Sequence, residues 1–136
     1  MIIIVKTHAP NETRDEVLGN RAKRASSGRS TEFVAVVNGV ESGLLSYEDW
    51  SRDKVGFIYE IFVLPDFRAQ GIGTALLLYA EDLAIHLGCT KIRLNARALD
   101  DQTNQEGLVL WYVGKGYIQK SDSAEQMEKN LGPREP

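Results

Sequence analysis

The sequence is poor in the residue types that build disulfides, metal centres and nucleophilic triads. Its 136 residues include one cysteine, Cys89, and two histidines, His8 and His86. A single cysteine excludes an intrachain disulfide and a cysteine-rich zinc site. No Ser/His/Asp or Cys/His arrangement emerges from the sequence, and no metal ligand set is expected. We interpret Cys89 as a small buried residue before a strand, and His86 as a cation favoured by the negative end of a helix.

The sequence has neither a strong net charge nor a long hydrophobic run. Its formal net charge of −3 gives no field that attracts nucleic acid or acidic membranes, so neither is expected as a partner. The apolar stretch Met1–Val5 is too short for a signal peptide or a membrane span, and we expect it to be a β-strand of a cytoplasmic protein. A chain of this length suits a single domain, residues 1–136, with one core. The oligomeric state is left open, a homodimer included.

Turn-forming residues and β-branched runs predict three consecutive antiparallel strands. Asn38-Gly39 suits a type I′ turn and separates the apolar stretches Phe33–Val37 and Val40–Tyr47, which predicts a β-hairpin. The next stretch, Val55–Leu64, is apolar on both faces and is therefore expected to be a central strand. Pro65 cannot donate a hydrogen bond to a sheet, so it ends that strand.

Between the first strand and the hairpin, the sequence predicts a helix over residues 10–25. Asn11 or Thr13 is expected to cap its first turn, because a short polar side chain there accepts a hydrogen bond from an unpaired backbone N–H group. Val17 and Leu18 are its expected apolar anchors.

A glycine-containing motif, Arg68-Ala69-Gln70-Gly71-Ile72-Gly73, follows the central strand and precedes a predicted helix from Thr74 to about Leu87. Two glycines two positions apart let the backbone bend tightly and approach a ligand closely. The first turn of a helix leaves N–H groups unpaired and carries a partial positive charge. The motif therefore predicts a phosphate-binding turn.

Other phosphate-binding patterns are excluded by what is missing. Leu76 stands where a dinucleotide-binding fingerprint has its third glycine, and Asn95, rather than an acid, lies roughly twenty residues further on. No Gly-Lys-Ser or Gly-Lys-Thr follows, so a P-loop is also excluded. The plain alternative is a glycine-rich turn that only starts a helix.

The second half of the sequence alternates helices and strands. Apolar residues three and four apart predict one buried face on the helix after the motif, formed by Ile72, Leu76, Tyr79, Leu83 and Leu87. Gly88 suits the end of that helix, and Lys91–Asn95 alternates as a strand, which predicts a right-handed parallel strand–helix–strand unit. A short helix over Gly107–Lys115 and two strands, one starting at Gly116 and one over Glu125–Leu131, complete the predicted order.

Two motifs carry a resemblance to a known family. Arg68-x-x-Gly71-x-Gly73, preceded by Val63-x-Pro65-x-Phe67, resembles the acetyl-CoA pyrophosphate loop of the Gcn5-related N-acetyltransferases (GNAT). Trp111–Tyr117 resembles the Tyr-x-x-x-Gly-Phe/Tyr segment of the same family, and the order of elements is similar from end to end. The resemblance implies a mixed α/β (α+β) fold, in which helices flank a largely antiparallel sheet of six to seven strands with one parallel unit at the acetyl-CoA site.

The resemblance also implies acetyl-CoA as the acetyl donor and assigns roles to residues of this chain. Acetyl-CoA would bind at the end of the central strand and at the glycine motif, through Phe62, Val63, Arg68, Ala69, Gln70, Gly71, Ile72, Gly73 and Thr74. A backbone N–H near Phe62 or Val63 would hold the developing oxyanion. The Tyr112 hydroxyl would give a proton to the leaving thiolate, although an aromatic residue beside Trp111 also suits simple packing. Gln105 stands where the family often has an asparagine.

Glu60 interrupts the otherwise apolar central strand, where a carboxylate is costly to bury unless it is paired or functional. The resemblance places this strand along the acetyl-CoA thioester. Glu60 is therefore a candidate base that takes a proton from an incoming ammonium, directly or through water. The alternative is a structural ion pair with Arg93 or Arg97 of the neighbouring strand. Basic residues near the end of the first helix, Arg21 among them, are interpreted as a solvated helix end rather than as a rim for the CoA phosphates.

Together these features predict an N-acetyltransferase that moves an acetyl group from acetyl-CoA to a primary amine by direct attack. A small or flexible cationic amine is expected, because Glu60 supplies negative charge to the cleft, with Glu48 and Asp49 near its mouth. The alternatives are an amine of a protein or peptide, and a non-catalytic module that binds acyl-CoA. The presence of both Glu60 and Tyr112 favours the enzyme.

Overall fold

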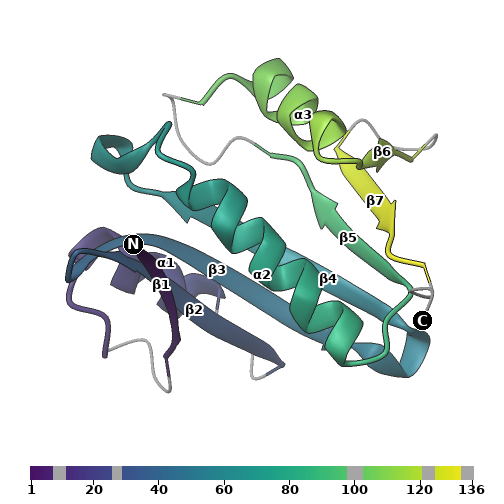
Figure 1. Ribbon diagram of the computed structural model, residues 1–136, viewed down its shortest axis with the longest axis horizontal. Helices are drawn as coiled ribbons and strands as arrows, with labels where there is room; N and C mark the ends of the chain where they lie inside the picture. Colours follow the sequence, from purple (N-terminus) through teal and green to yellow (C-terminus); the bar gives the residue numbers. More distant parts are fainter. Residues whose placement is uncertain (8–11, 26–28, 98–102, 121–124, 133–136) are drawn as a thin grey trace.

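The computed structural model describes residues 1–7, 12–25, 29–97, 103–120 and 125–132. Its seven-stranded sheet has the order β1-β2-β3-β4-β5-β7-β6 (Figure 1). The strands are β1 (Ile2–Lys6), β2 (Ser30–Val37), β3 (Val40–Trp50), β4 (Val55–Val63), β5 (Lys91–Asn95), β6 (Ile118–Gln119) and β7 (Gln126–Asn130). The helices are α1 (Glu16–Ala25), α2 (Ile72–His86) and α3 (Gln105–Gly114), with short 3₁₀ turns η2 (Ser51–Asp53) and η3 (Pro65–Phe67).

Neighbouring strands are antiparallel except β4 and β5, which are parallel and are connected through α2. The predicted mixed, largely antiparallel sheet with one parallel strand–helix–strand unit is thereby confirmed. The helices cover different faces of the sheet. Leu18 and Ala22 of α1 pack with Val34, Leu44 and Phe62 on one face, whereas α2 and α3 pack on the opposite face.

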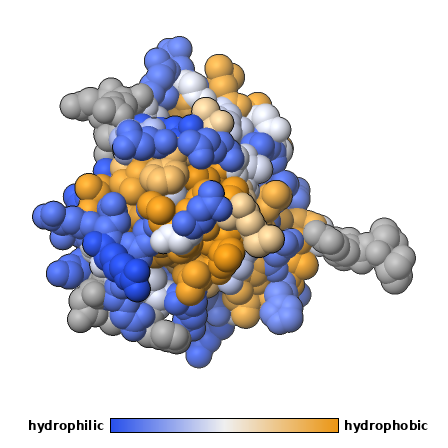
Figure 2. Space-filling model, turned by 60° about the vertical axis from the view of Figure 1, so that its left-hand side comes forward, coloured by the Kyte–Doolittle hydropathy of each residue, from blue (hydrophilic) through white to orange (hydrophobic). Residues whose placement is uncertain are grey.

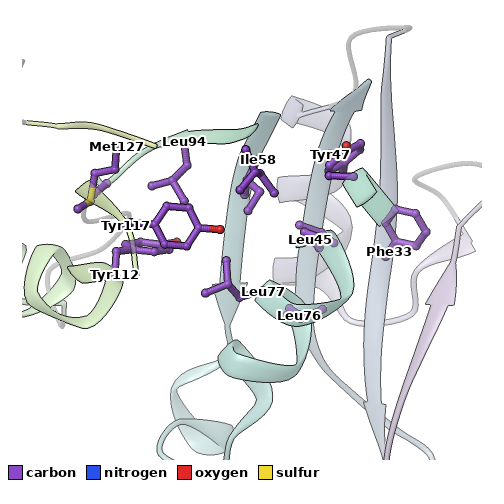
Figure 3. Packing of buried hydrophobic residues seen from close by; sticks show 14 of the residues in the cluster. Phe33, Leu45, Tyr47, Ile58, Leu76, Leu77, Leu94, Tyr112, Tyr117 and Met127 are labelled. Atoms are coloured by element: carbon purple, nitrogen blue, oxygen red, sulfur yellow. The ribbon is translucent and has the colours of Figure 1, made fainter. Parts of the chain in front are cut away.

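The larger core lies between the sheet and the second and third helices. Figure 3 shows Leu76 and Leu77 of α2 close to Leu45 and Ile58 of the sheet, and all four belong to one buried cluster. Tyr112 of α3 joins the same cluster beside Leu77. This packing fixes α2, and with it the glycine motif at the helix's first turn, against the central strands.

Local turn chemistry determines two element ends as the sequence predicted. Asn38 and Gly39 both have positive φ, at 50° and 81°, which is the geometry of a type I′ hairpin turn. Gly88 ends α2 with φ at 86°, and its N–H donates to the Ile85 carbonyl. Cys89 follows as a buried residue, as expected.

The beginning of α1 differs from the prediction. Asp15 caps this helix, because its Oδ1 accepts a hydrogen bond of 3.0 Å from the Leu18 N–H. The predicted cap Thr13 instead buries its hydroxyl oxygen without a hydrogen bond among the described residues, and Asn11 lies outside them. Val17 is 48% exposed, so Leu18 anchors the helix together with Ala22 and Ala25 rather than with Val17.

The buried face of α2 is wider than the predicted stripe. The helix begins at Ile72, two residues before the predicted Thr74, so the glycine motif overlaps its first turn. Ile72 and Leu76 are buried as expected, whereas Leu87 is 39% exposed. The unpredicted buried positions are Leu77, Ala80, Glu81 and Ala84. A single stripe was insufficient because α2 packs on the sheet and also contacts residues of α3 and β7.

Tyr47 of β3 yields a stability prediction. Its side chain is 2% exposed, and its buried hydroxyl has no strong hydrogen-bonding partner among the described residues: beside it lies the Cys89 thiol, a weak one. Tyr47→Phe is therefore expected to leave the free energy of unfolding unchanged or to raise it by up to about 1 kcal/mol, since it removes a poorly satisfied polar group. Urea titration measures this free energy.

The matched control is Tyr117→Phe. The Tyr117 hydroxyl donates a 2.8 Å hydrogen bond to Glu81, so its loss is expected to cost about 1.5–3 kcal/mol, the range for hydrogen bonds to charged groups. An equal destabilisation by both substitutions would contradict the prediction for Tyr47.

Candidate acetyl-CoA site

A cleft opens where β4 and β5 separate. The two strands pair only from Val55 with Lys91 to Ile58 with Leu94, although β4 continues to Val63. The cleft has a volume of about 490 Å³ and is lined by β4, by the segment leading into α2, and by α3. Figure 2, which brings the left-hand side of Figure 1 forward, shows hydrophobic side chains gathered at the centre of this face and hydrophilic ones around them.

A β-bulge in β4 decides which side chains face the two helical layers. Ser46 pairs with Glu60 and Tyr47 with Ile58, so Tyr59 has no partner on β3. In a regular strand, Ile58 and Glu60 would share a face. Because of the extra residue, Ile58 packs in the core beneath α2, whereas Glu60 meets α1 on the opposite face.

The backbone of β4 presents N–H groups to the cleft just after this bulge. Leu64 donates its N–H to the Ser42 carbonyl of β3, so by alternation Phe62 also faces β3. Ile61 and Val63 then direct their N–H groups away from β3, towards the side on which the cleft opens. The Val63 carbonyl supports this orientation, since it accepts a hydrogen bond from Arg68 Nε at 2.9 Å. Of the two predicted oxyanion donors, the geometry therefore favours Val63 over Phe62.

The glycine motif forms the turn that leads into α2. Ala69 and Gly71 have positive φ, at 64° and 85°, and such a turn exposes successive backbone N–H groups. Gly73 lies beneath the Trp111 ring, because a Cβ there would meet that ring at 3.7 Å. The motif is thus a backbone cradle at a helix N-terminus, and the residues present fit a pyrophosphate group.

The predicted acetyl-CoA residues lie together, with one exception. The cleft is lined by Phe62, Val63, Arg68, Ala69, Gly71, Ile72, Gly73 and Thr74. Gln70 is the exception: it is exposed, does not line the cleft, and donates from Nε2 to the Asp66 carbonyl at 3.3 Å.

Tyr112 of α3 also lines the cleft. It is 6% exposed, and its ring makes edge-to-face contacts with Trp111 and Tyr117 at centroid distances of 4.9 and 5.6 Å. Burial raises the pKa of its hydroxyl well above the usual value for tyrosine. The side chain therefore both packs and lines the cleft, and its hydroxyl stays protonated at physiological pH.

Glu60 has an ion-pair partner that the sequence did not predict. Its Oε2 lies 3.0 Å from Nη1 of Arg21 on α1. The two predicted partners bind elsewhere: Arg93 pairs with Glu128 at 2.6 Å, and Arg97 pairs with Glu125 at 2.8 Å. The bulge places Glu60 on the same face as Arg93, but the parallel pairing of β4 with β5 ends at Ile58 and Leu94, so Glu60 lies beyond it and meets α1 instead. The hydrogen bond from Arg93 lowers the pKa of Glu128.

Arg21 is also not part of a solvated helix end. Its guanidinium lies over the Phe62 ring at 3.7 Å from the centroid, and its side chain is 13% exposed. No local pattern in the sequence pointed to this contact, because Arg21 and Glu60 are 39 positions apart.

A buried polar cluster behind Tyr112 was also missed. Glu81 of α2 is 6% exposed, accepts a hydrogen bond from the Tyr117 hydroxyl at 2.8 Å, and lies 3.2 Å from Lys129 Nζ. Burial, followed by the charge of Glu81, raises the pKa of Tyr117. The one available signal was an acid at a helical position where neighbours three and four residues away are apolar. The cluster connects α2, β7 and Tyr117, which lies three residues after the end of α3. It therefore holds α3 in place beside the cleft.

The segment that departs from the family pattern has structural roles. Asn104 caps α3, because its Oδ1 accepts from the Gly107 N–H at 2.8 Å. Gln105 Nε2 donates to the Ala96 carbonyl at 2.6 Å, which ties the start of α3 to the end of β5. Neither side chain lines the cleft.

The described residues also bear on metal binding and on membrane insertion. No group of three or more His, Cys, Asp or Glu side chains in this part of the chain is arranged to hold a metal ion. None of its helices has the length and apolar composition needed to cross a membrane.

Comparison with known proteins shows which family shares this sequence and this fold. The model of the acetyltransferase (GNAT) family matches residues 5–104. The chain belongs to the GNAT acetyltransferase family. The match includes β4, the glycine motif and α2, and it ends just before α3.

Curated relatives of this GNAT protein match over part of their length. Thialysine N-epsilon-acetyltransferase of Bos taurus is 33% identical over 60 residues, which are 40% of this chain and 35% of the relative. An uncharacterized N-acetyltransferase of Methanocaldococcus jannaschii is 44% identical over 57 residues, 38% of this chain and 25% of the relative. The chain thus spans about a third or less of the length of these two relatives.

Solved structures of the family share the fold along nearly the whole chain. The ribosomal-protein-S18-alanine N-acetyltransferase from Escherichia coli has a TM-score of 0.70 at 18% identity, covering 99% of this chain and 97% of the other. PaiA N-acetyltransferase from Thermoplasma acidophilum, in complex with coenzyme A, has a TM-score of 0.66 at 14% identity, covering 96% and 99%. At these identities the likeness establishes the fold alone.

Proposed function

We propose that this GNAT protein transfers an acetyl group from acetyl-CoA to a primary amine. The observation that supports this most strongly is that the glycine cradle, Val63 of β4 and Tyr112 of α3 all line one cleft. The cradle would bind the pyrophosphate, and the adjacent β4 backbone would place the thioester. Arg68, which also lines the cleft, would add a charged contact to phosphate.

In the proposed reaction, each proton has a donor and an acceptor. A primary amine with a pKa near ~10 arrives as an ammonium and must lose a proton, which Glu60 takes directly or through water. The nitrogen then attacks the thioester carbon, and the Val63 N–H stabilises the developing oxyanion. As the carbon–sulfur bond breaks, the thiolate takes the proton of the Tyr112 hydroxyl. The nitrogen passes its surplus proton through water to the Tyr112 oxygen, and Glu60 returns its proton to the solvent.

For the acceptor, we infer a small or flexible cationic amine. Glu60 lines the cleft and supplies a carboxylate there. Glu48 and Asp49, by contrast, do not line the cleft. Each accepts a hydrogen bond from the residue two positions later: Glu48 from Trp50 Nε1 at 3.1 Å, and Asp49 from the Ser51 N–H at 2.8 Å. The inference therefore rests on Glu60. The name of the bovine relative gives an ε-amine of thialysine as its acceptor, which agrees with a flexible amine.

The experiment measures CoA release from acetyl-CoA in the presence of three sets of amines. Polyamines and lysine-like amines represent the proposed class, α-amino acids a neutral or anionic class, and short peptides the protein-acceptor alternative. The highest kcat/KM is expected for the cationic aliphatic amines. Best turnover of amino acids would refute the acceptor class, and best turnover of a peptide amine would support the alternative. Binding of CoA without turnover of any amine would indicate a non-catalytic module.

The binding half of the proposal gives a prediction for Arg68. Arg68→Ala is expected to raise the Kd for CoA about ten- to a hundredfold, because a charge-assisted hydrogen bond to phosphate contributes roughly 1.5–3 kcal/mol. Calorimetric titration with CoA measures it. Arg52→Ala, in the exposed turn η2 outside the cleft, is the control and should leave the Kd unchanged. Equal Kd values for Arg68→Ala and the wild type would remove Arg68 from the site.

A further inference from the structure

The Arg21–Glu60 ion pair brings α1 to the wall of the acetyl-CoA cleft. The pair is largely withdrawn from water, with side-chain exposures of 13% for Arg21 and 10% for Glu60. Desolvating two charges costs free energy that their mutual attraction only partly returns. A pair of this kind is therefore a weak source of stability, and its position suggests another role.

The two oxygens of the Glu60 carboxylate are in different situations. Arg21 bonds to Oε2 from the side of α1, and Arg21 is not among the residues that line the cleft, whereas Glu60 is. Among the described residues, Arg21 is the one that hydrogen-bonds this carboxylate, which leaves Oε1 for a ligand. The guanidinium is itself held in place, since it stacks on the Phe62 ring at 3.7 Å.

We propose that Arg21 is a positioning residue for the acceptor: it binds Oε2 of Glu60 and holds the carboxylate in one orientation, so that Oε1 receives the ammonium group of the incoming amine. This inference rests on the proposed acetyl transfer and names how the same site recognises its acceptor. The ammonium and the guanidinium share one carboxylate, each on its own oxygen. Arg21 acts through Glu60 and touches neither substrate.

The charged groups around Glu60 determine how its environment responds to pH. Arg21 faces it from α1, and Arg68 lies over the neighbouring Phe62 ring at 5.4 Å. Glu32 of β2 lies in the same cross-strand row, beyond Ser46, to which it is hydrogen-bonded at 2.7 Å. Arg97 lies across the cleft and is paired with Glu125. Arg21 is the cation in direct contact, so its removal leaves a buried carboxylate without its nearest countercharge.

The main test is Arg21→Met, assayed with acetyl-CoA and cadaverine, a primary aliphatic diamine. Methionine keeps a long side chain over Phe62 but carries no charge. The acidic limb of the pH profile of kcat/KM for cadaverine is expected to move to higher pH by about 1–3 units, because a buried carboxylate that loses an adjacent cation is protonated more easily. The KM for acetyl-CoA should not change. Arg93→Met, which breaks the Arg93–Glu128 pair outside the cleft, should leave the acidic limb in place.

A double-mutant cycle separates action through Glu60 from simple packing of α1. In the Glu60→Gln background, adding Arg21→Met is expected to cause no further loss of kcat/KM, because both changes remove one function. Losses that multiply, or an acidic limb in Arg21→Met that coincides with the wild-type limb, would overturn the proposal.

Two further arms cover the remaining outcomes. If Arg21→Met does not fold, Arg21→Lys retains the charge but not the planar stack. It should keep the wild-type acidic limb with a lower kcat/KM for cadaverine, and unchanged kcat/KM would overturn the proposal.

If the wild type releases no CoA with any amine, acetyl transfer itself fails. Calorimetric titration of cadaverine into the CoA complex then still tests Arg21, since equal affinity in wild type and Arg21→Met would overturn its positioning role.

Discussion

Replacing Tyr112 with phenylalanine is expected to lower kcat by about 10²–10⁴-fold, the contribution of a positioned general acid. The substitution removes only the hydroxyl, so the ring contacts with Trp111 and Tyr117 remain, and neither the fold nor the Kd for CoA should change. Single-turnover measurement of CoA release isolates the chemical step. Tyr79→Phe, a tyrosine of α2 outside the cleft, is the control. An unchanged single-turnover rate in Tyr112→Phe would show that the hydroxyl has no role in catalysis and that Tyr112 only packs.

The raised pKa of Tyr112 has a second measurable effect, on stability at alkaline pH. Burial disfavours the phenolate, so the folded state keeps the proton at pH values where the unfolded chain, with a tyrosine pKa of about 10, gives it up. The contribution is thus fully present below pH ~10 and is lost as the pH rises further. The decrease in unfolding free energy above pH ~10 should be smaller in Tyr112→Phe than in the wild type. Identical slopes would contradict the burial of the hydroxyl.

Gly71→Val is expected to weaken CoA binding by more than about a hundredfold, beyond the effect of Arg68→Ala. Two causes combine. Gly71 has φ at 85°, a conformation that a β-branched residue rarely adopts, and a side chain there would stand where the pyrophosphate approaches the backbone. A Cβ at Gly71 meets no atom within 4 Å, so no clash with the protein itself is expected. Calorimetric titration with CoA measures the Kd of the variant.

Gly88→Val is a closely matched control for this prediction. Gly88 lies at the other end of α2, has φ at 86°, and a Cβ there also meets nothing within 4 Å. Both variants should therefore lose similar stability through backbone strain, and thermal unfolding should show it. Only Gly71→Val should lose affinity for CoA. Equal CoA affinities in the two variants would show that the cradle does not bind phosphate.

Features that depend on neighbours in the sequence were predictable. The Asn38-Gly39 turn, the stop at Gly88 and the parallel unit through α2 all follow from residue types and spacing within a few positions. The glycine motif belongs to the same class, because a turn followed by a helix creates its own unpaired N–H groups. Eight of the nine predicted acetyl-CoA residues accordingly line one cleft, and only Gln70 turns away.

Features that depend on distant parts of the chain were not predictable. The alternative that paired Glu60 with Arg93 or Arg97 was wrong, because β5 leaves β4 before Glu60 and a helix far earlier in the sequence supplies Arg21 instead. Glu81 is not part of the predicted apolar stripe of α2, yet it is buried, because Lys129 and the Tyr117 hydroxyl come from the last part of the chain and bind it. Both errors concern polar groups whose partners are fixed by tertiary structure, which periodicity does not encode.

The unpaired Tyr59 in β4 also bears on how this strand can change in evolution. Removing Tyr59 would make Ile58 and Glu60 direct neighbours on a regular ladder, and each would keep its present face. Loss of any residue between Ile61 and Val63 would instead turn the preceding part of the strand over and bring Glu60 to the core side. In an alignment of relatives, a gap at Tyr59 is therefore compatible with an intact site, whereas a gap two to four positions later is not.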